Sequence, residues 1–251
     1  MKKTILAGIV LIAMLSVATT VFASDTTVSL GLKLWSNTWK ETVKTTGGAT
    51  RDYNNGNVLM AGPSLNVRYA KDWFADITYL AALGDYESPD WFASGDKMKF
   101  DRTDMDLMAG YLLHDPFNDL NVGFFVAYKT VDAPVSYTNQ AAGLNNADIG
   151  TWKLWGPGLG ILVEMHLDKA TLLYGNVEYL YLQEEFSFSS GGLSRFDTSG
   201  WSMEVAVAHA VTKAISFNLG VKYQRFKGWR GNGDAVTDSF SGLTAGVAYT
   251  F

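Results

Sequence analysis

Residues 242–251 read Gly-Leu-Thr-Ala-Gly-Val-Ala-Tyr-Thr-Phe, and this last stretch of the chain alternates between two kinds of side chain. Every second residue back from the end is apolar, with aromatic rings at Tyr249 and Phe251, whereas the residues between them are small or mildly polar. A period of two is typical of a β-strand with lipid on one face and a barrel interior on the other. Edge strands of soluble proteins show the same alternation, so the choice between a membrane strand and a soluble one depends on the rest of the chain.

The first 23 residues have the features of a cleaved export signal. A short positive segment with Lys2 and Lys3 is followed by an apolar run at 5–17, and Val21 and Ala23 occupy the recognition positions before Ser24. The run is short for a membrane-spanning helix and no basic stop-transfer cluster follows, which argues against an uncleaved anchor. We therefore predict cleavage after Ala23, with residues 24–251 as the mature barrel domain.

Composition supports a membrane barrel and excludes several other classes. Aromatic residues make up 14% of the 251 residues, and no apolar stretch beyond the signal approaches the ~18 residues of a transmembrane helix. The chain has no cysteine, so it offers no disulfide, no thiolate metal ligand and no lipoprotein anchor. The formal net charge of −5 becomes more negative once Lys2 and Lys3 are removed, which argues against a nucleic-acid partner.

Alternating segments can be followed through the whole mature chain, and their connections are short and long in turn. We predict strands at 27–39, 57–70, 73–84, 98–113, 120–131, 152–167, 170–185, 200–211, 215–226 and 239–251. The long connections are at 40–56, 85–97, 132–151, 186–199 and 227–238. Both termini then lie at the end with the tight turns, which faces the periplasm in outer-membrane barrels. The predicted fold is an all-β, antiparallel, up-and-down transmembrane barrel of ten strands; eight or twelve strands follow if one hairpin is misread.

Outward-facing aromatic residues fall at two heights, which a soluble sandwich does not require. One set lies about eight residues from the tight-turn ends, roughly 20 Å at a tilt near 40°, and this approaches the ~25 Å apolar band of an outer-membrane barrel. This predicted outer girdle consists of Tyr128, Tyr181, Trp201 and Tyr223. The predicted periplasmic girdle consists of Tyr69, Trp73, Tyr111, Tyr249 and Phe251.

The inward positions of the predicted strands carry many charged residues. They are Lys33, Arg68, Asp76, Arg102, Asp104, Asp106, Lys129, Glu164, Glu178, Glu204 and Lys222. The neighbours that we expect at similar heights are Arg68 with Asp76, Lys129 with Asp104, and Lys222 with Glu204. Since unpaired buried charge is costly, these residues fit either a salt-bridged polar plug or a hydrated, selective path, and the narrow width of a ten-stranded barrel favours the plug.

These features resemble those of the small bacterial outer-membrane β-barrels, the porin-family or OmpA/OmpW-like class. The resemblance is carried by the export signal and by the terminal strand, in which Tyr249 and Phe251 match an assembly signal. It implies the bacterial outer membrane as the location, contact with its lipid and lipopolysaccharide, and recognition by the barrel-assembly machinery. It implies no particular substrate.

No catalytic residue is expected. The ten-stranded omptin proteases of this class use acidic pairs and a histidine at the extracellular mouth, whereas His114, His166 and His209 all fall at the predicted periplasmic end. Asp104 and Asp106 have the chemistry of a water-activating pair, but carboxylates two apart on one strand more often belong to a lumen network.

No metal or cofactor is expected either. The second long loop and its flank are acidic, with Asp85, Glu87, Asp90, Asp96 and Asp101, but the spacing matches no calcium-binding pattern. The glycines at 156, 158 and 160 share one inward face and do not form a phosphate loop. They fit instead as room for bulky side chains opposite, such as Phe125 or Tyr174.

We therefore expect a non-enzymatic barrel that forms a narrow pore for ions or very small solutes. The first alternative is a structural scaffold whose extracellular loops, above all 132–151 and 186–199, bind a ligand or partner. The second is a barrel hydrolase acting on lipid A or peptides.

Deleting Phe251, or replacing it with Asp, is expected to leave the protein in the periplasm, because the assembly machinery of this class reads a terminal aromatic residue. Immunoblotting of separated outer-membrane and periplasmic fractions measures the effect. Normal outer-membrane levels of the Phe251→Asp variant would contradict the assignment of the assembly signal.

Overall fold

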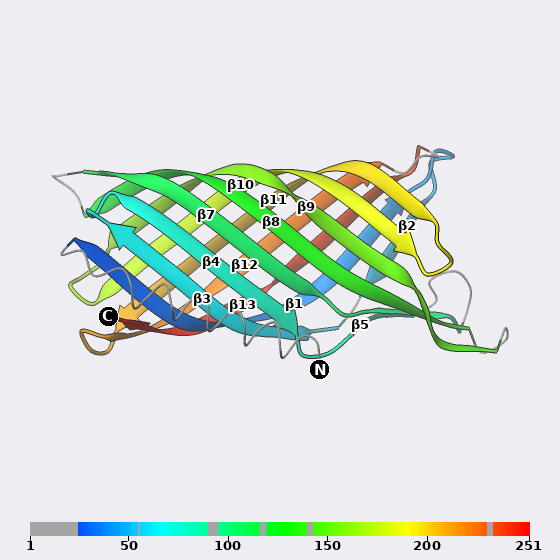
Figure 1. The fold of residues 1–251 in the computed structure, drawn as a ribbon, viewed down its shortest axis with the longest axis horizontal. Helices are drawn as coiled ribbons and strands as arrows, with labels where there is room; N and C mark the ends of the chain where they lie inside the picture. The colour runs from blue at the N-terminus through cyan, green and yellow to red at the C-terminus, as the bar shows by residue number, and fades with distance from the viewer. Residues whose placement is uncertain (1–24, 55, 90–94, 116–118, 140–142, 230–232) are drawn as a thin grey trace.

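The computed structural model of the chain is an all-β antiparallel barrel whose strands run obliquely around a long axis (Figure 1). It describes residues 25–54, 56–89, 95–115, 119–139, 143–229 and 233–251. The predicted signal peptide lies outside these residues, so cleavage after Ala23 stays a prediction. Among the described residues no helix is long and apolar enough to cross a membrane.

Ten strands close the barrel. They are β1 (Thr26–Lys44), β3 (Val58–Tyr69), β4 (Trp73–Ala82), β7 (Thr103–His114), β8 (Leu120–Asn139), β9 (Leu144–His166), β10 (Thr171–Phe188), β11 (Leu193–Ala210), β12 (Ile215–Trp229) and β13 (Ala235–Thr250). Each pairs with its neighbours in this order, and β13 pairs back with β1 from Thr250–Ser29 to Ala235–Lys44. The predicted ten-stranded up-and-down barrel is confirmed, and the counts of eight and twelve are wrong.

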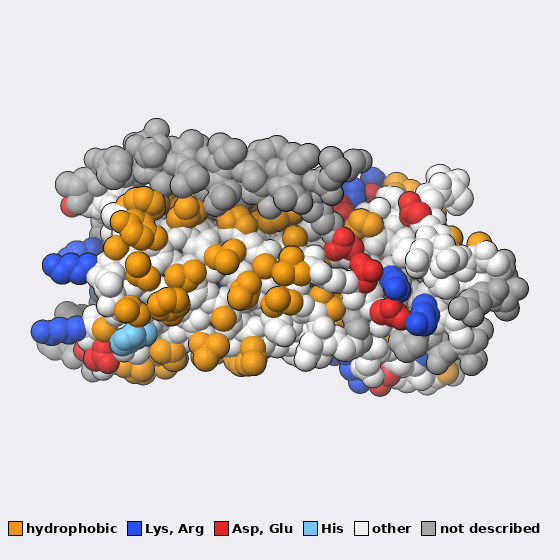
Figure 2. Space-filling view, turned by 90° about the horizontal axis from the view of Figure 1, so that it is seen from below, with side chains coloured by type: hydrophobic (Ala, Val, Ile, Leu, Met, Phe, Trp, Pro, Cys, Tyr) orange, Lys and Arg blue, Asp and Glu red, His pale blue; other side chains and the backbone are white. Residues whose placement is uncertain are grey.

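The outer surface is apolar because side chains along each strand alternate between the outside and the inside of the barrel, and the outward ones are mostly apolar. On β12, Phe217, Leu219 and Val221 are between 52 and 64% exposed, whereas Lys222 and Gln224 point inward and are buried. Figure 2 shows hydrophobic side chains over the left and middle of one face, with charged side chains at the left edge and beyond the band on the right. Apolar side chains exposed over so much of a surface need a partner other than water.

The short connections from β3 to β4, from β9 to β10 and from β11 to β12 lie at one end together with the C-terminus, and we call it the turn end; the opposite end is the loop end (Figure 1). At the turn after β9, the Asp168 carboxylate accepts hydrogen bonds from the backbone N–H groups of Ala170 (2.7 Å) and Thr171 (2.8 Å). These bonds lower the pKa of Asp168 because they favour its charged form. The predicted turn residues 116–118 lie outside the described residues.

The strands extend further at the loop end than the sequence predicts. Most of the connections expected at 40–56, 132–151, 186–199 and 227–238 are strand, because each hairpin ladder continues past the apolar band. Three short strands, β2 (Thr50–Asn54), β5 (Tyr86–Pro89) and β6 (Lys97–Phe100), lengthen the wall there. The predicted strand 98–113 is interrupted at Asp101 and Arg102, which separate β6 from β7. The pairing register differs on the two sides of this break: Thr103 of β7 pairs with Ala81 of β4, whereas Phe100 of β6 pairs with Tyr86 of β5.

Glycines on β9 make room for large side chains inside the barrel. A Cβ atom at Gly160 would lie 2.2 Å from the ring of Phe125, and one at Gly158 would lie 2.7 Å from Leu180. The expected contact with Phe125 is confirmed. Tyr174 instead lies in register with Glu164, further toward the turn end.

Gly160→Ala is expected to destabilise the barrel by about 1–3 kcal/mol, the usual range for overpacking, because the new methyl group would collide with Phe125 and with the Val177 carbonyl oxygen. The measurement is unfolding in urea followed by heat-modifiable migration on gels. Gly84→Ala is the control, since nothing lies within 4 Å of the position that its methyl group would take. Equal stability of the two variants would contradict this account of the packing.

Candidate functional site

Described residues of the barrel interior line a lower and an upper cavity. The lower lumen cavity, about 260 Å³, is lined by residues toward the turn end, including Arg68, Glu164 and Ser216. The mouth cavity, about 350 Å³, is lined by residues toward the loop end, including Trp39 and Phe188. A layer of closely packed side chains lies between them. These three parts differ in chemistry.

Ion pairs cross the lower lumen cavity. The Lys33 ammonium on β1 lies 2.7 Å from the Glu204 carboxylate on β11, and Arg68 on β3 bonds to Glu164 on β9. Neither pair joins adjacent strands, so each spans part of the lumen. The Asp76 carboxylate accepts hydrogen bonds from neutral groups on Asn66 and Thr78.

Asp106 on β7 joins two cations at the top of this cavity. Its carboxylate bonds to Lys129 on the neighbouring β8 and lies 2.9 Å from the ammonium of Lys222 on β12, on the opposite wall. Lys129 also lies 3.5 Å from Asp104. Lys129 is 1% exposed and Lys222 6%. Charges buried to this extent are tolerated only when they are paired, which this arrangement achieves.

Arg102 connects the ionic groups to the apolar layer above them. Its guanidinium forms two parallel bonds of 2.6 Å to the Asp104 carboxylate and donates to the Gln224 side-chain oxygen at 2.7 Å. The same planar group lies over the Phe240 ring, 3.7 Å from its centroid, and 5.6 Å from the Trp35 ring. A planar cation can bond at its edge and stack on its face, and this lets a fully buried arginine lie in an apolar layer.

Nine of the ten barrel strands, all except β7, contribute to the apolar layer. Eight of them supply buried side chains, namely Trp35, Met60, Leu80, Val131, Leu154, Leu180, Phe226 and Phe240, which belong to one packed cluster. On β11, Gly200 leaves space for the Phe226 ring, and Arg102 precedes β7. Tyr86 of β5 stacks on Phe100 of β6, with centroids 4.8 Å apart. We call this set, with Arg102, the closing layer.

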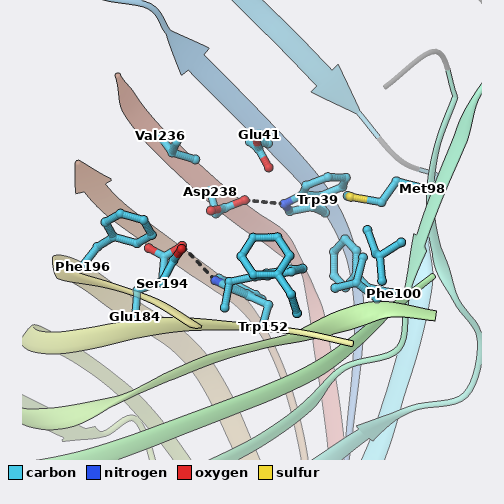
Figure 3. A pocket seen from close by; sticks show the side chains of 14 residues that line it. Trp39, Glu41, Met98, Phe100, Trp152, Glu184, Ser194, Phe196, Val236 and Asp238 are labelled. Carbon is cyan, nitrogen blue, oxygen red and sulfur yellow. Dashed lines mark hydrogen bonds between the residues drawn. The ribbon is translucent and has the colours of Figure 1, made fainter. Parts of the chain in front are cut away.

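The mouth cavity lies above the closing layer and combines aromatic rings with carboxylates (Figure 3). Trp39 donates its indole N–H to Asp238 at 2.8 Å, and Trp152 donates to Glu184 at 3.0 Å. Thr198 donates to the other oxygen of Glu184 at 2.9 Å. Two carboxylates are thus oriented by indole groups from different walls of the cavity.

The predicted lumen residues all point inward, but their partners differ from those expected. Arg68 pairs with Glu164 rather than Asp76, because Asp76 lies in register with Asn66. Lys222 and Glu204 are in register across β11 and β12, yet the shortest contacts of each are to Asp106 and to Lys33. Glu178 is buried in the wall of the lower lumen cavity, with Ser202 as a hydrogen-bond partner. Lys129 lies 3.5 Å from Asp104, as expected, but its closer partner is Asp106, which was not expected.

The predicted girdle residues lie on the outside of the barrel. Tyr69, Trp73, Tyr111, Tyr128, Tyr181, Trp201, Tyr249 and Phe251 are each at least 37% exposed, and Tyr223 is partly exposed. Trp73 packs against Tyr111 at the turn end, and Tyr249 against Phe251. Their contact with a membrane interface stays a prediction.

The structure places the three histidines at or near the turn-end termini of β7, β9 and β11, far along the strands from the mouth cavity. Within the described ranges no group of three or more His, Asp or Glu residues could hold a metal ion. Of the acidic loop, Asp90 lies outside those ranges, and Glu87 is paired with Lys97 and Lys99.

Sequence reasoning missed the mouth cavity. Its residues Trp152 and Glu184 lie at the ends of predicted strands, and Phe186 and Phe196 lie in the predicted loop at 186–199. The usable signal was a period of two that continues past the apolar band, for example Glu184, Phe186 and Phe188.

No family model matches the chain, and no curated protein does. Among solved structures, the outer-membrane protease OmpT from Escherichia coli aligns with 92% of this chain and 98% of its own, at a TM-score of 0.63 and 15% identity. Neisserial surface protein A aligns with 88% of this chain and 97% of its own, at a TM-score of 0.38 and 14% identity. The toluene transporter TodX of P. putida aligns with 91% of this chain and 90% of its own, at a TM-score of 0.37 and 10% identity. The likeness to OmpT shows that the fold is that of an outer-membrane β-barrel.

Asp106→Asn is expected to cost about 3–5 kcal/mol of stability, because it leaves the buried Lys129 and Lys222 without their shared carboxylate. Urea unfolding of the barrel in detergent measures the loss. Asp132→Asn is the control, since its pair with Lys153 is long (3.8 Å) and exposed. A loss at Asp106 no larger than the loss at Asp132 would show that the buried ion pairs contribute little.

Proposed function

We propose that this chain is an exported, non-enzymatic outer-membrane barrel that does not conduct freely and binds a small ligand at its extracellular mouth. The loop end would face the outside and the turn end the periplasm, as in other barrels of this fold. The proposal includes removal of the signal peptide after Ala23, insertion by the barrel-assembly machinery, and contact of the outer face with lipid and lipopolysaccharide.

The observation that carries the proposal is the closing layer. Its side chains come from eight of the ten barrel strands and from Arg102, and Trp35, Arg102, Leu180 and Phe240 are each 0% exposed. A ten-stranded barrel is narrow enough for side chains to fill it. The lower lumen cavity and the mouth cavity are therefore separated, and solutes arriving from outside reach only the mouth cavity.

The mouth cavity supports the binding half of the proposal. Its volume of about 350 Å³ is at the lower end of the range of roughly 300–1,000 Å³ for small-molecule sites. Its wall is mostly apolar, with a few oriented polar groups, which is the usual composition of such sites.

A narrow ion path is the second candidate, and the charged lower lumen cavity favours it. For this function the closing layer would have to open, at the cost of breaking the contacts of Arg102 with Asp104 and Phe240.

A hydrolase is the least supported reading, although OmpT is named as a protease. The mouth cavity has carboxylates and Ser194 in its wall, but all three histidines lie toward the turn end, so none can act as a base there.

Single-channel recording tests the choice between a closed barrel and a pore. The purified barrel in a planar bilayer is expected to be silent, whereas a Trp35→Ala/Phe240→Ala variant, which removes two large side chains from the closing layer, is expected to show conductance steps. Stable steps from the unmodified protein, with an ion preference that changes in Asp104→Asn/Asp106→Asn, would contradict the proposal and support the pore.

A further inference from the structure

We propose that the mouth cavity selects small amphiphilic cations, molecules with a flat apolar body and an ammonium group, and that Glu184 is the residue that holds the charge. The inference rests on the proposed function of this cavity as a binding site and adds the class of ligand. Three features of the wall carry it: its aromatic rings, its charge and the fixed position of Glu184.

Six aromatic side chains from five strands line the cavity. They are Trp39, Phe100, Trp152, Phe186, Phe188 and Phe196. Trp39 packs edge-to-face on Phe100 at 4.8 Å, and Phe186 lies 4.7 Å from Phe188. Phe188 is 44% exposed, so it marks a side on which the cavity meets solvent. Walls of this kind suit a flat apolar body, and ring faces also attract an ammonium group.

The charged groups among the described residues of the cavity wall are acidic. Glu41, Glu184 and Asp238 lie on β1, β10 and β13, and the described residues of the wall include no lysine or arginine. An anionic ligand would meet repulsion from the Glu184 carboxylate. A cationic ligand would gain attraction in a partly desolvated site, where charges interact more strongly than in water.

Glu184 is the best placed of the three carboxylates. Its hydrogen bonds, from the Trp152 indole N–H and the Thr198 hydroxyl, come from neutral donors, so they orient the carboxylate without neutralising it. Each oxygen retains further capacity to accept a hydrogen bond. On β12, Gly228 leaves the space that this carboxylate occupies, because a Cβ atom there would lie 2.8 Å from the Glu184 oxygen. The charge is therefore held in place before any ligand arrives.

The neighbouring residue provides a matched control. Glu185 points to the opposite face of β10 and is bonded to the Arg195 guanidinium at 2.8 Å. Removing its charge changes the net charge of the protein by the same amount as removing that of Glu184. It does not change the cavity wall.

The experiment measures binding of three naphthalene probes to the mature chain folded in a non-ionic detergent, by isothermal titration calorimetry against empty micelles. The probes are (2-naphthylmethyl)trimethylammonium, neutral 2-naphthalenemethanol and the anion 2-naphthoate. We expect the ammonium probe to bind at least about tenfold tighter than the alcohol, a difference of roughly 1.4 kcal/mol, and the naphthoate to bind most weakly.

Glu184→Gln is expected to reduce ammonium binding about tenfold and to leave alcohol binding unchanged, because the amide keeps the shape and an acceptor for Trp152. Glu185→Gln is expected to change neither. Equal affinities of the ammonium probe and the alcohol would overturn the selectivity but leave a binding site at the mouth. Unchanged ammonium binding in Glu184→Gln would overturn the role of Glu184. Binding of none of the three probes would overturn the proposed function itself.

Discussion

The contact of Asp106 with Lys129 and Lys222 ties opposite walls of the barrel together. β7 and β12 lie five strands apart in the ring of ten, so this contact spans the lumen, and the pairs Lys33–Glu204 and Arg68–Glu164 span it at other positions. Each charge faces a narrow interior in which an unpaired ion would cost several kcal/mol. Pairing across the lumen is therefore the constraint that the rest of the interior has to satisfy.

The closing layer follows from this constraint. Once Asp104 is inside, it needs a cation, and Arg102 supplies one from the short break between β6 and β7. Because the guanidinium is planar, it bonds to Asp104 at its edge and lies over Phe240 with its face, so ionic groups and aromatic rings can be stacked without a gap. Beyond this point most inward side chains are apolar, and the buried Asn37 amide oxygen accepts a hydrogen bond from the Tyr86 hydroxyl at 2.7 Å. The carboxylates of the mouth cavity follow, where the strands have passed beyond the apolar outer band.

The strand count and the inward or outward direction of the charged residues could be predicted, because both depend only on a period of two along each strand. The ion-pair partners could not. Arg68 and Glu164 are 96 residues apart, and their contact depends on the tilt and stagger of the closed barrel, which no single strand records. The mouth cavity was missed for a different reason: the segments with Phe186 and Phe196 are polar enough to resemble loops, and only the continued ladder between β10 and β11 makes them strand.

Thiol labelling on the two sides of the closing layer tests the central claim most directly, since the chain has no cysteine of its own. Ser194→Cys places a thiol in the mouth cavity and Ser216→Cys places one in the lower lumen cavity. Each variant is reconstituted into liposomes with mixed orientation and treated from outside with a small, membrane-impermeant, cationic methanethiosulfonate. If the layer is closed, the Ser194→Cys thiol is labelled only in molecules whose loop end faces the outside of the liposome, and the Ser216→Cys thiol only in those whose turn end does. The labelled fractions of the two variants then add up to one. Complete labelling of both variants would show that the reagent passes through the barrel, and would contradict the account.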